Sequence, residues 1–233
     1  MFVTIIFLFL FNFLPMDCKM SAQNAQTLDK ICSVVKSKYL VFDTTESVKL
    51  QLISEQKNLV CNISINSVFF DICSLKNIVL RINKPRFFYQ KMLSLEIVTK
   101  PSFLIFIYEF EDYIYRHRYV IFNASLYKLP FVINRSDYFD AFLLYQVISQ
   151  VSGEAKILFD ESFGRVYNET ISLKFECKGF SGISFVFDTE ILRRILSIND
   201  NFDSCLLNWE DSESPVNFNF YSTFLSVFIF VAT

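Results

Sequence analysis

The sequence predicts an all-β, or mainly β, protein: an antiparallel sandwich or jelly-roll-like fold of two β units, with one or two short helices. Apolar and polar side chains alternate from Leu59 to Asn66, as in a half-buried strand. The same alternation recurs at 48–52 and 171–176. All four glycines lie between Gly153 and Gly182, so the turn chemistry changes midway and indicates two units.

The first half is dominated by short apolar runs spaced as in a sandwich. Leu28, Ile31 and Val35 recur at helical spacing and predict a short helix over 26–36, with Thr27 as its cap. Strands are then expected at 39–43, 48–52, 59–66, 77–83, 93–97, 103–110 and 113–122.

In the second half, 141–149 fits either a strand or a helix. Strands are expected at 171–176 and 182–187, followed by a helix over 190–198 capped by Asp188 or Thr189. Pro130 and the polar residues after it suggest the boundary between units. The predicted organisation is therefore a signal peptide at 1–20, a first β domain at 21–130, a second β-rich unit at 131–213 and an apolar tail at 214–233.

The N-terminus has the pattern of an export signal. Phe2 to Leu14 is uncharged and apolar, shorter than the roughly 20 residues of a membrane span, and polar residues follow it. Cleavage is expected between Asp17 and Ala22. The alternative is a buried N-terminal strand or helix.

The C-terminus resembles a signal for attachment of a glycosylphosphatidylinositol (GPI) lipid anchor. No charge follows Glu213, and small polar residues precede the apolar tail, with Ser212 as the candidate attachment site. Two alternatives are a last strand of the core and a membrane-spanning helix. The prediction is a protein secreted or tethered to the outer face of the plasma membrane.

Six cysteines suggest disulfides in an exported chain. Cys32 and Cys61 are 29 positions apart, and Cys177 and Cys205 are 28 positions apart. We expect these two local pairs, with Cys73 either bonded to Cys18 or free. There is one histidine and no Cys-x-x-Cys, so neither a metal nor another cofactor is expected.

Four N-glycosylation motifs strengthen the extracellular prediction, at Asn62, Asn123, Asn134 and Asn168. The formal net charge of −2 gives no broad basic field, so nucleic acid is not expected as a partner.

The segment 113–120 gathers basic and aromatic residues on one predicted strand. Its candidate ligand face for an acidic group or a sugar consists of Tyr115, Arg116, His117 and Arg118. The alternative is an exposed strand whose arginines pair with Glu109, Glu111 and Asp112.

No catalytic residues are assigned. Two Val-Phe-Asp-Thr segments, at 41–44 and 186–189, lack the glycine of aspartic-protease turns. No Gly-x-Ser-x-Gly motif accompanies His117.

The spacing from Cys32 to Cys61, followed by Asn-Ile-Ser-Ile, resembles the opening of a CUB domain. The layout of the chain is similar to that of CUB-like secreted proteins of nematodes. The resemblance, from Cys32 to Ile65, implies a jelly-roll-like sandwich that binds rather than catalyses. The predicted function is therefore a non-enzymatic extracellular glycoprotein that binds a protein or glycan, in surface or innate defence. A small secreted carboxylate-based glycosidase and a structural coat component are the alternatives.

Overall fold

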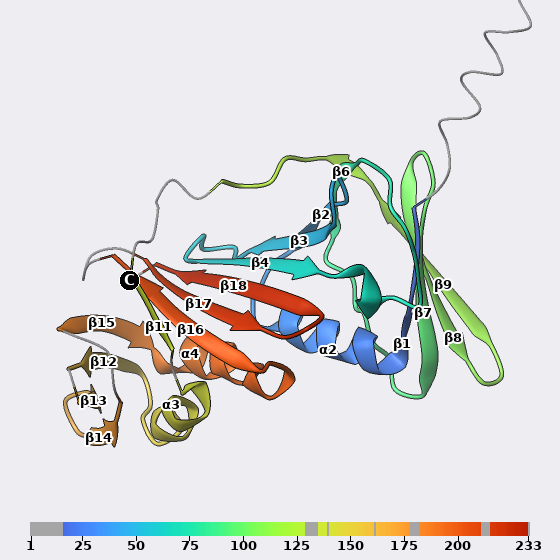
Figure 1. Ribbon diagram of the computed structural model, residues 1–233. Coiled ribbons are helices and arrows are strands. Elements are labelled where there is room, and N and C mark those ends of the chain that lie inside the picture. Colours follow the sequence, from blue (N-terminus) through green and yellow to red (C-terminus); the bar gives the residue numbers. More distant parts are fainter. Residues whose placement is uncertain are drawn as a thin grey trace, which may run out of the picture.

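The computed structural model describes residues 16–128, 135–138, 140–160, 162–177, 182–210 and 215–232. These residues form mostly antiparallel β-sheet and three α-helices. Figure 1 shows how these elements are arranged. The mainly β class is confirmed at this coarse level. A jelly-roll-like sandwich is not what forms, because the strands are distributed over three sheets of nine, five and four strands.

The central sheet joins strands from both halves of the chain. Its strands in spatial order are β10 (Phe122–Asn123), β6 (Val79–Asn83), β2 (Tyr39–Asp43), β3 (Val48–Ile53), β4 (Leu59–Ile65), β18 (Leu225–Val231), β17 (Val216–Tyr221), β16 (Ser204–Trp209) and β11 (Arg135–Tyr138). Between β4 and β18 seven residue pairs face each other, from Leu59 opposite Val231 to Ile65 opposite Leu225. This junction makes one sheet out of two halves.

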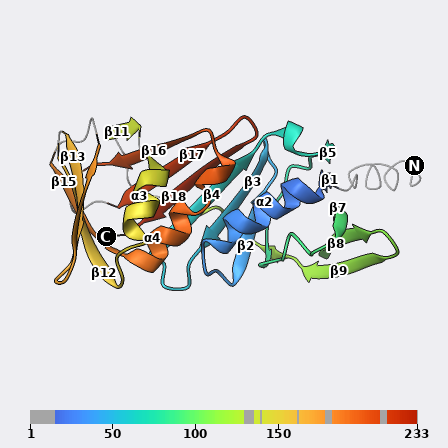
Figure 2. The same cartoon turned by 90° about the horizontal axis from the view of Figure 1, so that it is seen from below.

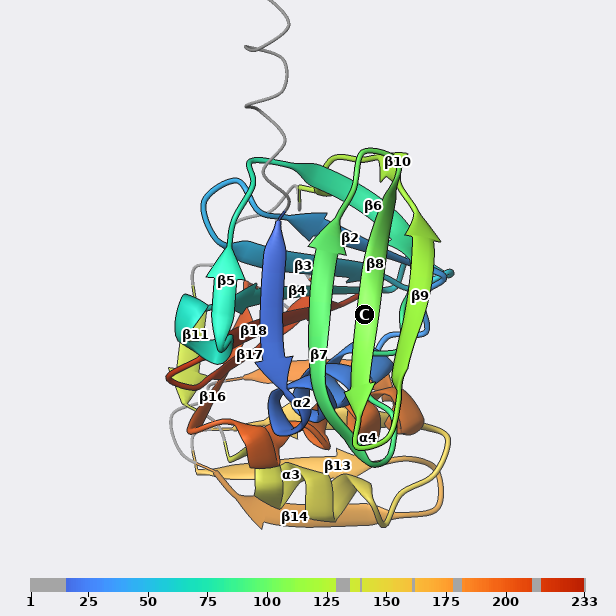
Figure 3. The same ribbon diagram turned by 90° about the vertical axis from the view of Figure 1, so that its right-hand side faces the viewer.

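Two smaller sheets stand at either end of the central sheet (Figure 1). The first end sheet has the order β5 (Ile72–Ser74), β1 (Asp17–Ser21), β7 (Met92–Thr99), β8 (Phe103–Phe110) and β9 (Ile114–Val120). Figure 3 shows it face-on. The second end sheet has the order β14 (Ser172–Glu176), β13 (Phe163–Tyr167), β12 (Glu154–Phe159) and β15 (Ile183–Asp188).

Three helices lie in a row on one side of the central sheet, between the end sheets (Figure 2). They are α2 (Ala22–Ser33), α3 (Ala141–Ile148) and α4 (Thr189–Leu196). Each begins at a side-chain cap, from Ser21, Asp140 and Asp188 respectively. The predicted cap Asp188 is confirmed, and 141–149 proves helical. The first helix starts earlier than expected, since Ser21 rather than Thr27 caps it.

The two halves repeat one order of elements. A strand and a helix come first, β1 with α2 and β11 with α3. The sheet segment β6-β2-β3-β4 corresponds to β15-β12-β13-β14, and β1-β7-β8-β9 corresponds to β11-β16-β17-β18. By this correspondence β4 matches β14, and β18 matches β9. The predicted boundary near residue 130 lies in residues 129–134, outside the described ones, and stays a prediction.

The halves differ in one helix. In the second half α4 lies between β15 and β16, whereas residues 84–91 between β6 and β7 contain no helix and end in a turn. This connection is only eight residues long, which leaves little room for a helix and the turns on either side of it. Phe87 is buried, and its backbone N–H donates to Asp29 Oδ1 at 2.7 Å, which ties the segment to α2.

The chain ends depart most from the sequence predictions. β1 lies between β5 and β7, and Met16, Cys18 and Met20 are at most 2 % exposed. Cleavage after residue 20 would remove most of this strand, whose burial disagrees with the expected cleavage between Asp17 and Ala22. The apolar run Phe2 to Leu14 was the basis of both the export signal and its alternative, and for that run both stay predictions. Residues 1–15 lie outside the described ones.

The apolar tail forms β17 and β18 in the middle of the central sheet, with Phe218, Phe220, Val227 and Ile229 fully buried. Replacing the tail by a lipid would remove both strands, so the anchor prediction is wrong and the alternative of a last core strand is correct. Ser212 lies outside the described residues. No helix in the described ranges is both long and apolar enough to cross a membrane.

Candidate interaction surfaces

The repeat identifies two strand edges that have no partner strand in the described part of the chain. Inside the chain β4 pairs with β18, but their counterparts β14 and β9 are the outer strands of the two end sheets. In the described part of the chain no strand pairs with the outer edge of either one. Each exposes a row of backbone N–H and C=O groups that can extend a sheet with another chain.

The predicted ligand face lies on β9. Tyr115, His117 and Tyr119 share one face. Tyr115 packs on Tyr108 and Tyr89 and Tyr119 packs on Phe106, while Tyr115 Oη lies 2.9 Å from His117 Nδ1. Arg116 and Arg118 are exposed on the opposite face. The structure therefore places the predicted residues together on an edge strand. Their role as a ligand face stays a prediction.

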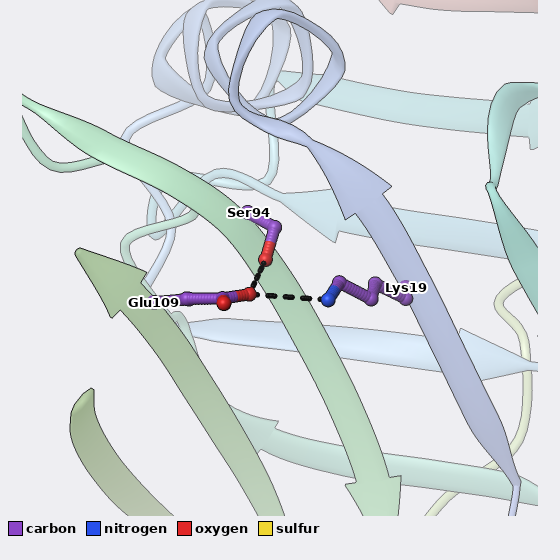
Figure 4. Close-up of polar contacts among 3 residues, drawn as sticks. All are labelled: Lys19, Ser94 and Glu109. Atoms are coloured by element: carbon purple, nitrogen blue, oxygen red, sulfur yellow. Dashed lines mark hydrogen bonds and ion pairs between the residues drawn. The ribbon is translucent and has the colours of Figure 1, made fainter. Parts of the chain in front are cut away.

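Glu109 is not an arginine partner as the alternative assumed. Its Oε2 accepts hydrogen bonds from Ser94 Oγ at 2.6 Å and from Lys19 Nζ at 3.1 Å, so β1, β7 and β8 are linked (Figure 4). The Ser94 hydrogen bond and then Lys19 lower the pKa of this carboxyl.

The helical face carries few charges. Along their full lengths α2 contains Asp29 and Lys30, α3 contains no charged residue, and α4 contains Glu190, Arg193 and Arg194. Lys30 Nζ lies 4.0 Å from Asp200 Oδ2. α3 instead exposes Phe142 and Tyr145. This face is nearly neutral overall.

The segment 124–128 after β10 runs over the opposite face of the central sheet (Figure 1). Gln51, which is 3 % exposed, holds it there from β3. Its Oε1 accepts the Tyr127 N–H at 2.7 Å, and its Nε2 donates to the Tyr127 carbonyl at 2.9 Å and to Asn62 Oδ1 at 2.8 Å. The strand prediction placed Gln51 on a polar face but could not show that 76 residues later the chain returns to it.

A cavity of about 1010 Å³ lies between this segment and the sheet, and we call it the connector pocket. Apolar walls come from both the sheet and the segment 124–128, and the pocket also has four cationic side chains and one carboxylate, Glu55. The cations are Lys38, Lys57, Arg81 and Lys128.

The other predicted sites fall in varied places. Asn62 is half-buried beneath segment 124–128, while Asn123 is exposed on β10. Asn168 Oδ1 instead closes a turn by accepting the N–H groups of Thr170 and Ile171. Asn134 lies outside the described residues.

All six cysteines are free thiols in the structure. Cys18 and Cys73 face each other across β1 and β5, with their Sγ atoms 3.1 Å apart. Cys32 and Cys61 are both buried, whereas Cys177 is half-buried after β14 and Cys205 is buried in β16. The pairs Cys32 with Cys61 and Cys177 with Cys205 stay predictions, without the oxidising compartment assumed for them.

No protein-family model and no curated protein sequence matches the chain. Its fold is similar to solved structures of proliferating cell nuclear antigen (PCNA). An A. fulgidus PCNA bound to the C-terminal region of FEN-1 has a TM-score of 0.73 and 12 % identity, over 93 % of this chain and 97 % of that one. PCNA from Thermococcus kodakaraensis has a TM-score of 0.71 and 11 % identity, over 93 % and 99 %. The PCNA2–PCNA3 complex of Sulfolobus tokodaii has a TM-score of 0.73 and 10 % identity, over 93 % and 98 %.

These similarities correct several predictions. The chain has the fold of PCNA-type clamps, so the resemblance to CUB-like secreted proteins is wrong. The other predictions that depended on this resemblance are wrong as well, because they do not fit this fold. They are the secreted or GPI-anchored glycoprotein, the extracellular partner, the defence role, and the glycosidase and coat alternatives. The expectation of an extracellular partner without nucleic acid is not supported by this similarity. The prediction that the chain is not an enzyme agrees with its similarity to these clamps.

Proposed function

We propose that this chain is a subunit of a ring-shaped DNA clamp, a non-enzymatic scaffold that encircles DNA and holds partner proteins. The observation that carries the proposal is the similarity of fold over 93 % of the chain, together with two free edges that match the strands of its own internal junction.

The repeat supplies the rule for assembly. Within the chain an edge of the β4 type pairs antiparallel with an edge of the β18 type. The same pairing between chains would join β14 of one subunit to β9 of the next. Such head-to-tail contacts use two different surfaces and close into a ring when the rotation at each joint allows it. In the Sulfolobus tokodaii structure, PCNA2 and PCNA3 form a complex with each other, so the next subunit can be a different clamp-type chain.

The helical face is the surface we assign to DNA. Figure 2 shows α2, α3 and α4 side by side, and a ring built through β9 and β14 would carry this helical layer on from subunit to subunit. Arg193, Arg194 and Lys30 are the helical cations that can contact phosphates. Since so few charges are present, enclosure rather than charge holds the DNA.

The opposite face is the surface we assign to partner proteins. The A. fulgidus PCNA is bound to the C-terminal region of FEN-1, which shows that a clamp of this fold can hold a partner's terminal segment. In this chain the connector pocket has a volume of about 1010 Å³ and apolar walls. A terminal segment of a partner would lie there without obstructing the helical face.

Retention on circular DNA tests the proposal. The protein is purified from its own cells under native conditions, with the subunits it holds, and incubated with linear DNA coupled to beads. A closed ring can thread onto the free end, and ligation then closes the DNA into a circle. An encircling clamp remains on the beads in high salt, because salt weakens phosphate contacts but does not open a ring. Cutting the DNA once should then release it.

The same DNA left unligated is the matched control. Equal loss from circular and linear DNA in high salt would show that binding is electrostatic only, and would contradict the proposal.

A further inference from the structure

The connector pocket stands apart from the other cavities in charge. Lys38, Lys57, Arg81 and Lys128 face only one carboxylate, Glu55. A second cavity, of about 430 Å³ at the turn between β17 and β18, is lined by Glu46 and no cation. A third, of about 260 Å³ beside α4, balances Lys36 and Arg194 against Glu55, Asp188 and Glu190. The connector pocket thus concentrates positive charge on apolar walls.

Arg81 is the best-defined cation of the pocket. It lies on β6 directly opposite Val41 on one side and Phe122 on the other. Its Cζ is 4.8 Å from the ring centroid of Tyr39 and 5.6 Å from that of Phe122. Contact with two aromatic rings fixes the guanidinium plane without neutralising its charge.

The Nε atom of Arg81 lacks a hydrogen-bond acceptor. It is buried, and it makes no hydrogen bond to any described residue. None of the ion pairs among the described residues involves it. A buried N–H without an acceptor is costly, and a guanidinium held in plane favours a two-point contact with a carboxylate or phosphate.

The wall opposite the sheet is held in position. Gln51 binds both the N–H and the carbonyl of Tyr127, so the segment 124–128 does not need to be ordered by a ligand. A pre-formed pocket costs less entropy to occupy. Tyr39, Val41, Ile53 and Leu126 supply apolar surface next to the cations.

We propose that the connector pocket binds an acidic peptide segment of a partner protein, with an anionic side chain on Arg81 and an adjacent aromatic or aliphatic side chain on the apolar wall. Lys38 and Lys128, both exposed at the rim, attract the flanking acidic residues. This deepens the proposed function, because it names the chemistry of the partner that the clamp would hold.

Fluorescence anisotropy with a synthetic peptide tests the inference. The probe is a fluorescein-labelled peptide in which Asp and Glu flank one Phe, and its control replaces the acids by Asn and Gln. We expect the acidic peptide alone to bind, with an affinity that falls as salt increases. Arg81→Gln should weaken binding about tenfold or more, the effect of losing a hydrogen-bonded charge.

Arg81→Lys keeps the positive charge but loses the planar set of N–H donors of the guanidinium. This variant should therefore bind the acidic peptide more weakly than the native chain and more tightly than Arg81→Gln. Arg165→Gln, at an exposed arginine of β13 far from the pocket in Figure 1, is the matched control and should bind normally. A version of the peptide with phosphoserine in place of one Glu distinguishes the two anions: tighter binding assigns phosphate, and equal binding assigns carboxylate.

Should Arg81→Gln not fold, the charge reversals Lys38→Glu and Lys128→Glu at the rim provide the same test and should weaken binding together. Equal binding of the amide peptide, or native affinity in folded Arg81→Gln or in the folded double reversal, would overturn the inference. Peptide binding is measured without DNA, so its failure is distinguishable from failure of the clamp function.

Discussion

The helical face and the connector pocket lie on opposite sides of the central sheet and differ in charge. The three helices carry three cations and two carboxylates, whereas the pocket alone gathers four cations around one carboxylate. The surface assigned to DNA is thus the less basic one. Under the two proposals this difference implies that the ligands are held in different ways: DNA by enclosure in a closed ring, and the partner peptide by charge and apolar contact.

The largest expected effect comes from breaking the proposed ring at β9. The backbone N–H groups of successive residues in a strand point to opposite edges of that strand. One of the two substitutions Arg116→Pro and His117→Pro therefore removes an N–H on the free outer edge of β9, and the other removes an N–H that bonds to β8. The variant that loses the outward group should fold normally, lose DNA retention in high salt altogether and keep peptide binding. Thermal unfolding identifies which variant it is. Full retention by both folded variants would contradict the assignment of this edge.

The second largest effect is expected at the connector pocket. Gln51→Leu removes the hydrogen bonds that hold Tyr127, so we expect a loss of about 1–3 kcal/mol in unfolding free energy and weaker binding of the acidic peptide. DNA retention should not change. Denaturant unfolding and anisotropy measure the two effects, and unchanged peptide affinity would show that the segment needs no anchoring.

A smaller effect is expected on the helical face. Arg193→Gln together with Arg194→Gln removes two of its three cations. The slope of log affinity against log salt for linear DNA should fall by about two, while retention on circular DNA persists. Loss of circular retention in this double variant would mean that charge and not enclosure holds the DNA.

The smallest effect should leave both surfaces untouched. Glu109→Gln weakens the link between Lys19 and Ser94 in the first end sheet. The folded pKa of Glu109 is lowered, so the stability it contributes is present above its unfolded pKa and is lost as pH falls through the folded value. At neutral pH the melting temperature of the variant should be slightly below that of the native chain. In acid the two melting temperatures should be equal. A difference that persists in acid would exclude this charge effect.

Local structure was largely predictable from the sequence. The alternation at Leu59 to Asn66 indeed forms β4, and Asp188 caps α4 because its carboxylate accepts two N–H groups at the start of that helix. The family, the compartment and the role of the C-terminal tail were predicted wrongly. An uncharged apolar run looks the same whether it is a signal to be removed or, like β17 and β18, the buried centre of a sheet.

The candidate surfaces depend on contacts between residues far apart in sequence, which periodicity does not report. β4 pairs with a strand more than 150 residues later, and Gln51 binds the backbone of Tyr127. Arg81 was visible only as a single cation in the apolar run 79–82, and its stacking between Tyr39 and Phe122 requires three strands in register. Features that depend on pairing between distant strands could therefore not be predicted from the local sequence pattern.

Electron microscopy of the natively purified assembly tests the central claim most directly. If β14 of one subunit pairs with β9 of the next as β4 pairs with β18, averaged images will show a closed ring with a central hole. Particles of a single chain, or a compact assembly without a hole, would contradict the account.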